Sequence, residues 1–335
     1  MGIAAYIKVI GRGKDGARPL SREQAHDLMS QVLDGQVTDL EIGAFCLAMR
    51  IKGETPDELI GFLQATTERC IDLRPALPAA PGGFVLLPSY NGSRKLPNLT
   101  PLLAWALARR GVGVLVHGPS EDPTRVTSSQ VFAAGGWPRV KDATQLAACW
   151  QAGQPAFIDI ADLCPSVARL LAVRWTVGLR NPAHTIVKLL DPFAVATPDG
   201  AGSNACALPR LRVINHTHPE YGESLAGFIS LSGASALLMR GTEGEPVADA
   251  RRQPRFDVFL GGQRQDALSR APVEGVLVSL PELPEGREAA VTASWIESVR
   301  NDPQRLPAAI EAQADCLAQA LSSLQSRLPS GSTTA

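Results

Sequence analysis

The stretch that most constrains the fold is Phe84–Gly118, FVLLPSYNGSRKLPNLTPLLAWALARRGVGVLVHG. It begins with a short apolar run that ends at Pro88, which has no N–H to give to a sheet. Thr100 followed by Pro101 predicts the start of a helix, since Thr caps helices well and Pro at the first helical position loses no needed donor. Gly111 then ends the helix, and a second apolar run follows. This order of strand, loop, helix and strand predicts a parallel sheet.

The same pattern repeats after Gly118. Asp122 with Pro123 predicts the start of a second helix, and Gly135 predicts its end. Two helix N-termini are therefore expected beyond the carboxyl ends of parallel strands, where open α/β sheets bind ligands. Free N–H groups and the helix dipole favour an anion at such a place.

We predict a phosphate site at this edge of the sheet. The alternative is an ordinary solvated loop. The predicted site residues are Asn91, Gly92, Arg94, Lys95, Asn98, Thr100 and Arg125. Arg125 is expected in the first turn of the second helix.

Three helices are predicted nearer the N-terminus, each by a capping box in which the cap and the third helical residue satisfy each other's backbone N–H. The pairs are Ser21 with Gln24, Thr38 with Glu41, and Thr55 with Glu58. Residues 1–19 before them are predicted to be irregular. Three such helices bury little alone, so we expect them to pack on a larger unit and to offer an apolar face to a dimer.

The predicted fold class is α/β, with a small N-terminal helical domain and a large α/β domain that has a mostly parallel central sheet. The predicted boundaries are 1–75 for the helical, dimerising domain, 76–83 for a hinge rich in Pro and Ala, and 84–335 for the α/β domain. Further strands are expected at 156–160, 211–215, 236–239 and 276–280. An amphipathic segment is expected at 143–150, and further helices are expected at 165–171, 220–232 and 303–324.

Composition narrows the possible partners. With 32 Lys and Arg against 33 Asp and Glu, the formal net charge is −1, so a nucleic acid would need a local basic patch. Aromatic residues make up only 5%, which argues against a surface built from stacking platforms. Six scattered cysteines without a C-x-x-C motif indicate core residues in a reducing compartment. No signal peptide or membrane-spanning run is evident, so we expect a cytoplasmic protein without a membrane partner.

The segment LSREQAHDLMSQVLDGQVTDLEIGAFCLAMRIKGETPDEL resembles the helical domain of anthranilate phosphoribosyltransferases, and a weaker likeness covers most of the chain. The resemblance implies a two-domain dimer that binds phosphoribosyl diphosphate with magnesium at the domain junction. It also implies roles for single positions. Asn98 and Thr100 match the family's Asn-Ile-Ser-Thr, Arg125 corresponds to a phosphate-binding lysine, and Arg174 matches an arginine near the anthranilate site.

Other motifs of the active enzymes are changed. The family's Gly-Thr-Gly-Gly-Asp turn reads Pro88-Ser89-Tyr90-Asn91-Gly92 here, and such a turn cannot bring its backbone as close to a diphosphate as glycines can. The stretch that should hold the metal-binding Asp-Glu pair reads MRGTEGEP at 239–246, without that pair. Magnesium therefore has no evident ligands.

The replacement stretches PSYNGSRK, HGPSEDPTRV and RGTEGEPVADARR resemble the YbiB-like branch of the family. That resemblance implies binding of nucleic acid, DNA or RNA, largely without sequence preference. We therefore predict a homodimeric nucleic-acid-binding protein with no expected cofactor and no assigned catalytic residue. The alternative is a phosphoribosyltransferase with an altered acceptor, which would need Mg²⁺.

A rim of basic residues is predicted to hold the polyanion backbone. Its members are Arg174, Arg180, Lys188, Arg251, Arg252 and Arg255. The alternative is that these are solvated side chains paired with Asp and Glu. His216 and His218 share a strand face but lack a clear third ligand, so no metal site is predicted.

Overall fold

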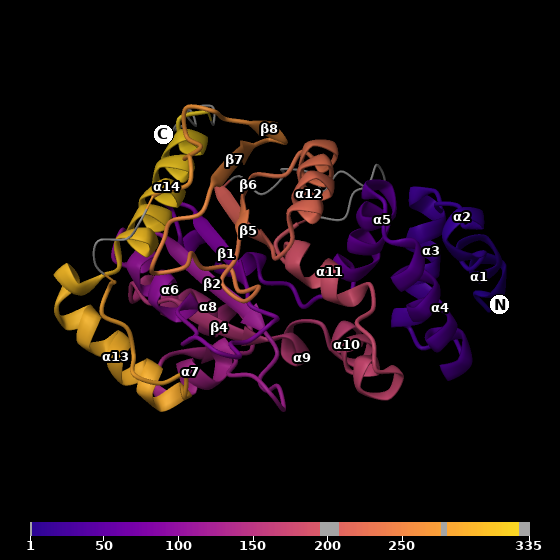
Figure 1. Ribbon diagram of the computed structural model, residues 1–335, viewed down its shortest axis with the longest axis horizontal. Coiled ribbons are helices and arrows are strands. Elements are labelled where there is room, and N and C mark those ends of the chain that lie inside the picture. The colour runs from indigo at the N-terminus through magenta and orange to yellow at the C-terminus, as the bar shows by residue number, and fades with distance from the viewer. Residues whose placement is uncertain (1, 195–207, 276–279, 328–335) are drawn as a thin grey trace, which may run out of the picture.

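The computed structural model describes residues 2–194, 208–275 and 280–327. Its centre is a sheet with the strand order β3-β4-β2-β1-β5-β6-β7-β8 (Figure 1). Strands β1 to β6 pair in parallel, and β7 and β8 are antiparallel additions at one edge. The fold class is therefore α/β with a mostly parallel sheet, as predicted. The bounds are β1 Phe84–Pro88, β2 Gly113–Gly118, β3 Arg139–Val140, β4 Ala156–Asp159, β5 Arg210–His216, β6 Ala236–Arg240, β7 Phe256–Leu260 and β8 Gln263–Arg264.

Strand β1 marks the point where the strand order changes direction. Phe84 pairs with Gly113 of β2 on one side and with Arg210 of β5 on the other. The loops that follow β1, β2 and β6 all leave from the carboxyl edge of the sheet. Such a switch point is where open α/β sheets form a ligand-binding crevice.

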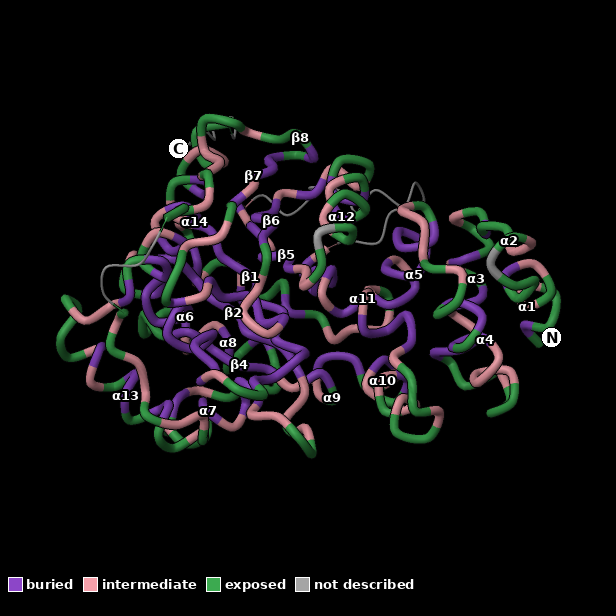
Figure 2. The backbone as a smooth tube through the Cα atoms, viewed as in Figure 1, coloured by how far each residue is buried: buried purple, intermediate pink, exposed green. Residues whose placement is uncertain are grey.

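Alternating side chains of the central strands feed two cores, one on each face of the sheet. Val85 and Leu87 belong to one core, and Phe84 and Leu86 belong to the other. Figure 2 shows these strands buried beneath helices with exposed outer faces. The first core is covered by α6 Thr100–Ala108, α7 Ser128–Ala134, α13 Ala289–Asn301 and α14 Ala308–Gln325. The second is covered by α8 Ala143–Gln151, α9 Ile160–Leu163, α10 Pro165–Val177, α11 Ala183–Leu189 and α12 Pro219–Ser232.

The N-terminal helices form a bundle at the far end of the molecule from α13 and α14 (Figure 1). All three predicted capping boxes are present, at the starts of α3, α4 and α5. The prediction that residues 1–19 are irregular is wrong, because Ile3 and Ile10 are buried and Glu41 accepts the N–H of Ile3 at 3.0 Å. The bounds are α1 Ala4–Ile10, α2 Gly13–Gly16, α3 Arg22–Leu33, α4 Asp39–Lys52 and α5 Pro56–Thr67.

Three predicted element boundaries differ in the structure. Helix α7 is capped by Thr127 in a capping box with Gln130, whereas Asp122 accepts the N–H of Thr124 in the preceding loop at 2.9 Å. The N-cap of α6 is Leu99, one residue before the predicted cap. The C-terminal helix is interrupted at Pro307, so that a short 3₁₀ helix, η2 Pro303–Arg305, precedes α14.

Two further predictions concern connecting segments. Arg74–Ala79 forms a short 3₁₀ helix, η1, that packs on α8. The strand predicted at 276–280 falls almost entirely outside the described residues.

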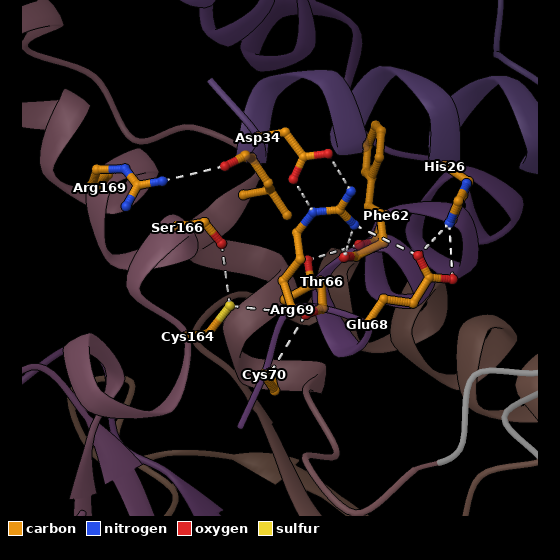
Figure 3. Close-up of polar contacts among 12 residues, drawn as sticks. His26, Asp34, Phe62, Thr66, Glu68, Arg69, Cys70, Cys164, Ser166 and Arg169 are labelled. Carbon is orange, nitrogen blue, oxygen red and sulfur yellow. Dashed lines mark hydrogen bonds and ion pairs between the residues drawn. The ribbon is translucent and has the colours of Figure 1, made fainter. Parts of the chain in front are cut away.

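The bundle is joined to the α/β domain through α10, α11 and α12, which contact α3 and α5. In Figure 3, Arg69 pairs with Asp34 at 2.6 Å and Arg169 of α10 donates to the carbonyl of Leu33 at 3.3 Å. The thiols of Cys70 and Cys164 both point to the carbonyl of Thr66, at 3.5 and 3.9 Å. These contacts hold α10 between the bundle and the sheet. Within the described ranges, no helix combines the length and apolarity that a membrane crossing requires.

Candidate functional site

The loop after β1 is built around Glu245, which comes from the loop after β6. Glu245 is 1% exposed, and its Oε1 accepts the N–H groups of Asn91 and Gly92, both at 2.8 Å. Its Oε2 accepts the hydroxyls of Ser89 and Thr100. A carboxylate of the chain itself therefore binds the first pair of amides that the sequence assigned to phosphate.

A second carboxylate, Glu243, binds the next turn of the same loop. It accepts the N–H groups of Arg94 at 2.9 Å, Lys95 at 3.0 Å and Leu96 at 3.0 Å. Burial raises the pKa of Glu243, but these three donors and the charge of Arg125 outweigh burial and bring the pKa below its ordinary value. Glu243 is thus held as an anion in a cradle of amides.

The loop after β6, which carries Glu243 and Glu245, packs closely against the loop after β1. Among the described non-glycine residues, Glu243 alone has a positive φ, of 52°. At the following Gly244, an added Cβ would lie 1.7 Å from the side-chain nitrogen of Asn91. The glycine is therefore required for the loops to approach, and Glu243 is held in a sparsely populated conformation.

The two helix N-termini converge as predicted, although the second begins at Ser128. The hydroxyls of Ser89 and Ser128 lie 2.7 Å apart, and Asn98 Oδ1 accepts the N–H of Thr100 at 3.2 Å. Asn98 also donates to the carbonyl of Val126 at 3.3 Å. Asn98 and Thr100 are fully buried, and their hydrogen bonds hold the loops together.

The remaining predicted cations of this site are more exposed. Arg94 and Lys95 expose their side chains to solvent while their amides bind Glu243. Arg125 lies in the loop before α7, not in a helix, and donates to the carbonyl of Gly92 at 3.3 Å. Arg125 therefore lies next to the amides that bind the two glutamates, and its charge acts on both Glu243 and Lys188 of α11.

Basic side chains from three parts of the chain gather beside Arg125, and we call this group the cation cluster. It consists of Arg50 at the end of α4, Arg125, Arg174 on α10, Arg180 between α10 and α11, and Lys188 on α11. Arg174 forms an ion pair with Asp122 at 3.7 Å. Arg50 was not predicted from the sequence, because nothing local distinguishes it from any basic residue in the last turn of a helix.

Two members of the cluster have lowered pKa values, because burial and neighbouring cations both disfavour their charged forms. The pKa of Lys188 is lowered to about 8, chiefly by burial and also by the charges of Arg180 and Arg125, while Glu245 opposes them. Burial also lowers the pKa of Arg180, reinforced by Arg174 and Arg125. His184, buried next to them, has a pKa of about 3 and is neutral.

The other half of the predicted basic rim is not part of this cluster. Arg251 pairs with Asp249 at 2.7 Å, Arg252 donates to the carbonyl of Gly275 at 2.7 Å, and Arg255 is exposed. No interaction recorded for the described residues links these three to the cluster. For Arg251 the alternative of an acid-paired surface arginine is the one that holds.

The residues around the cradle do not fit a magnesium ion as they stand. Glu243 and Glu245 are both taken up by backbone and hydroxyl donors. Across the described ranges, no group of three or more His, Cys, Asp or Glu side chains is placed to hold a metal. His216 Nδ1 instead faces the carbonyl of His218 at 3.1 Å.

His117, at the end of β2, is not available as a base. It is fully buried, its Nδ1 lies 2.8 Å from the hydroxyl of Tyr90, and burial lowers its pKa to about 3. His117 therefore has a structural role beneath the site.

Comparison with known proteins places this geometry in context. Residues 5–70 match the helical bundle domain of a glycosyl transferase family. The chain is 39% identical to YbiB of Escherichia coli (strain K12) over 310 residues, which is 92% of this chain and 91% of the relative. It is 26% identical to the anthranilate phosphoribosyltransferase of Leifsonia xyli over 288 residues, 84% of this chain and 75% of that enzyme.

Solved structures show the same fold. Anthranilate phosphoribosyltransferase from Thermus thermophilus superposes with a TM-score of 0.59 at 17% identity, covering 95% of this chain and 96% of that one. The Saccharomyces cerevisiae enzyme in complex with PRPP and Mg superposes with a TM-score of 0.64 at 13% identity, covering 95% and 88%. At such identities the likeness establishes the fold.

Proposed function

Because the chain belongs to the anthranilate phosphoribosyltransferase-like family, in its YbiB-like branch, we propose that its cleft holds nucleic acid, DNA or RNA, largely without reading the sequence. The observation that carries the proposal is the cation cluster. Five basic side chains converge there, and Asp122 forms the one ion pair recorded for its described members. A backbone of regularly spaced phosphates would discharge such a group and release counterions.

The filled amide cradle supports a contact made by side chains. Five backbone N–H groups that a phosphate would need are bound by Glu243 and Glu245. Guanidinium and ammonium groups next to them remain available, and they bind phosphate without reading bases. Contact through the side chains of the cation cluster suits a polymer better than a small diphosphate, which would have to reach the amides.

The test is fluorescence anisotropy with labelled strands and duplexes of mixed sequence over a range of salt. We expect binding at low salt and a linear fall of log K with log salt, with a slope of about −0.9 per phosphate contacted in duplex DNA. Arg180→Ala should reduce the slope by about one contact, and Arg255→Ala is the matched control, since it removes an exposed arginine outside the cluster. No binding at low salt, or equal effects of both variants, would refute the proposal.

We also propose a homodimer formed through α4. Leu40, Leu47 and Ile51 are 86%, 47% and 53% exposed, and their spacing places them along one side of this helix. Light scattering should give twice the mass of one chain, and Leu47→Glu should give a monomer. A wild-type monomer would contradict this part of the proposal.

The second candidate is a phosphoribosyltransferase with an altered acceptor, and the family and fold support it directly. Asn98 and Thr100, which match the family's motif, do lie at the start of α6 beneath the site. Calorimetry with phosphoribosyl diphosphate and magnesium separates the two functions. Saturable binding with turnover of an aromatic acceptor would favour the transferase. For the transferase to bind its diphosphate at the amides, Glu243 and Glu245 would have to leave them.

A further inference from the structure

Trp175 is the exposed aromatic side chain nearest in sequence to the arginines of the cation cluster. It lies in the last turn of α10 and is 54% exposed, although large aromatic side chains are mostly buried in folded proteins. The guanidinium of Arg174 stacks on its ring, 4.1 Å from the centroid. In the described part of the chain, no other aromatic ring contacts it.

The position of Arg174 places this ring beside the cation cluster. The guanidinium that stacks on Trp175 also reaches Asp122, in the loop after β2, at 3.7 Å. Helix α10 ends at Val177 and is followed by Gly178 in a left-handed conformation, with Arg180 two residues further on. The exposed ring and the cation cluster are therefore neighbours, and a single ligand can touch both.

We propose that Trp175 is a stacking contact for one unpaired base, so that a single strand binds with its phosphates on the cation cluster and a base on the indole ring. This inference rests on the proposed function and names the form of nucleic acid that the site distinguishes. Every base offers a flat π face, so stacking favours binding without sequence preference. The faces of paired bases in a duplex are already stacked on their neighbours, and exposing one costs a few kcal/mol.

The charge around Trp175 argues for a nucleic acid and against a protein partner as the occupant. A ring stacked on Arg174, which is itself close enough to Arg180 to influence its charge, offers an apolar plane inside a positive field. This matches the alternation of base and phosphate along a strand. The overall scarcity of aromatic residues excludes an extended stacking platform but not one ring. Arg174 also holds the ring on one side, so that less rotamer freedom is lost when a base stacks on the other.

The experiment compares a labelled dT20 strand with a 20-base-pair duplex for the full chain and three variants. Trp175→Ala should weaken binding of the strand by about 5- to 150-fold and change binding of the duplex less than about twofold. Trp175→Phe keeps a ring and should retain most of the strand affinity. Leu231→Ala is the matched control, because Leu231 is 48% exposed and lies at the C-terminal end of α12, away from the cluster.

The affinity for a strand of the same length with abasic sites tests the stacking contact directly. If Trp175 had only a structural role, the loss of bases from the strand would not change this affinity. The wild-type protein should bind the abasic strand about as weakly as Trp175→Ala binds dT20. Trp175→Ala should bind the abasic strand almost as well as it binds dT20, because it has no ring left to stack on a base. Equal weakening of strand and duplex, or no weakening of either, overturns the stacking contact while leaving the proposed function intact. Failure of the wild-type protein to bind either nucleic acid overturns both.

Discussion

Replacing Glu245 by alanine tests whether the carboxylates that fill the amide cradle stabilise the fold. The change leaves the N–H groups of Asn91 and Gly92 buried without an acceptor, because both bond to Glu245 at 2.8 Å. Ser89 can turn to Ser128, and the Thr100 hydroxyl can rotate, so most of the cost falls on the two amides. At about 1–3 kcal/mol for each orphaned donor, we expect a loss of about 3–5 kcal/mol.

This loss is a large part of the stability of a typical protein, about 5–15 kcal/mol. The free energy of unfolding of a protein of this size falls by about 3 kcal/mol per molar urea, so the unfolding midpoint followed by tryptophan fluorescence should fall by about 1–1.7 M. Glu245→Gln keeps an oxygen for the two amides and can donate to the hydroxyls, so its loss should stay below about 1.5 kcal/mol. Glu223→Ala, an exposed acid on α12, is the surface control and should shift stability by at most about 0.5 kcal/mol.

A different result would refute the reasoning. If Glu245→Ala stayed within about 1 kcal/mol of the wild-type protein, the two amides would be finding other acceptors without strain. The cradle would then be open to an external anion, and the case for the transferase would strengthen. Calorimetry of this variant with inorganic phosphate would show such binding directly.

Three further results are expected. Nucleic-acid affinity should fall between pH 7 and 9, because Lys188 has a pKa of about 8 and binds phosphate only when charged; Lys188→Arg should flatten that profile in anisotropy titrations. The pKa of Glu243 is lower in the folded protein than its unfolded value of about 4.5, so its charge stabilises the fold above that pH and the effect is lost as pH falls through the folded pKa. The urea midpoints of the wild-type protein and Glu243→Gln should therefore differ at pH 7 and converge in acid. Asp122→Asn keeps the acceptor for Thr124 but frees Arg174, so it should tighten binding of dT20 by about 1.5- to 5-fold; unchanged or weaker binding would contradict this.

Local signals were sufficient to predict the parallel sheet and the capped helices. The unit from β1 to β2 is punctuated by Pro88 and Gly111, and each capping box needs only four residues. The wrong start of α7 shows the limit of such signals, because Asp122 and Thr127 both resemble caps. The capping-box spacing of Thr127 with Gln130 was present in the sequence and marks the true start.

The contents of the site depend on contacts between distant parts of the chain and could not be predicted in the same way. Glu243 and Glu245 reach amides about 150 residues earlier, and nothing in MRGTEGEP says that its carboxylates turn back to that loop. Arg50 joins the cluster because α10 and α11 pack on the bundle, which is a tertiary result. The sequence indicated the edge of the sheet that carries the site, but not which charges meet there.

The two sets of charges divide the site into an inner part, next to Glu243 and Glu245, and an outer part, around Arg174 and Arg180. In the inner part Lys188 lies 3.4 Å from the carbonyl of Gly244 and feels the charge of Glu245, so the acids offset the cations there. In the outer part Asp122 forms an ion pair with Arg174, and its charge also acts on Arg180. A diphosphate aimed at the amides meets two carboxylates, and each such repulsion costs about 4 kcal/mol at 4 Å near a protein surface. A polymer lying along the outer part meets guanidinium groups instead, and this electrostatic difference is the reason why we propose a nucleic acid and not a sugar diphosphate.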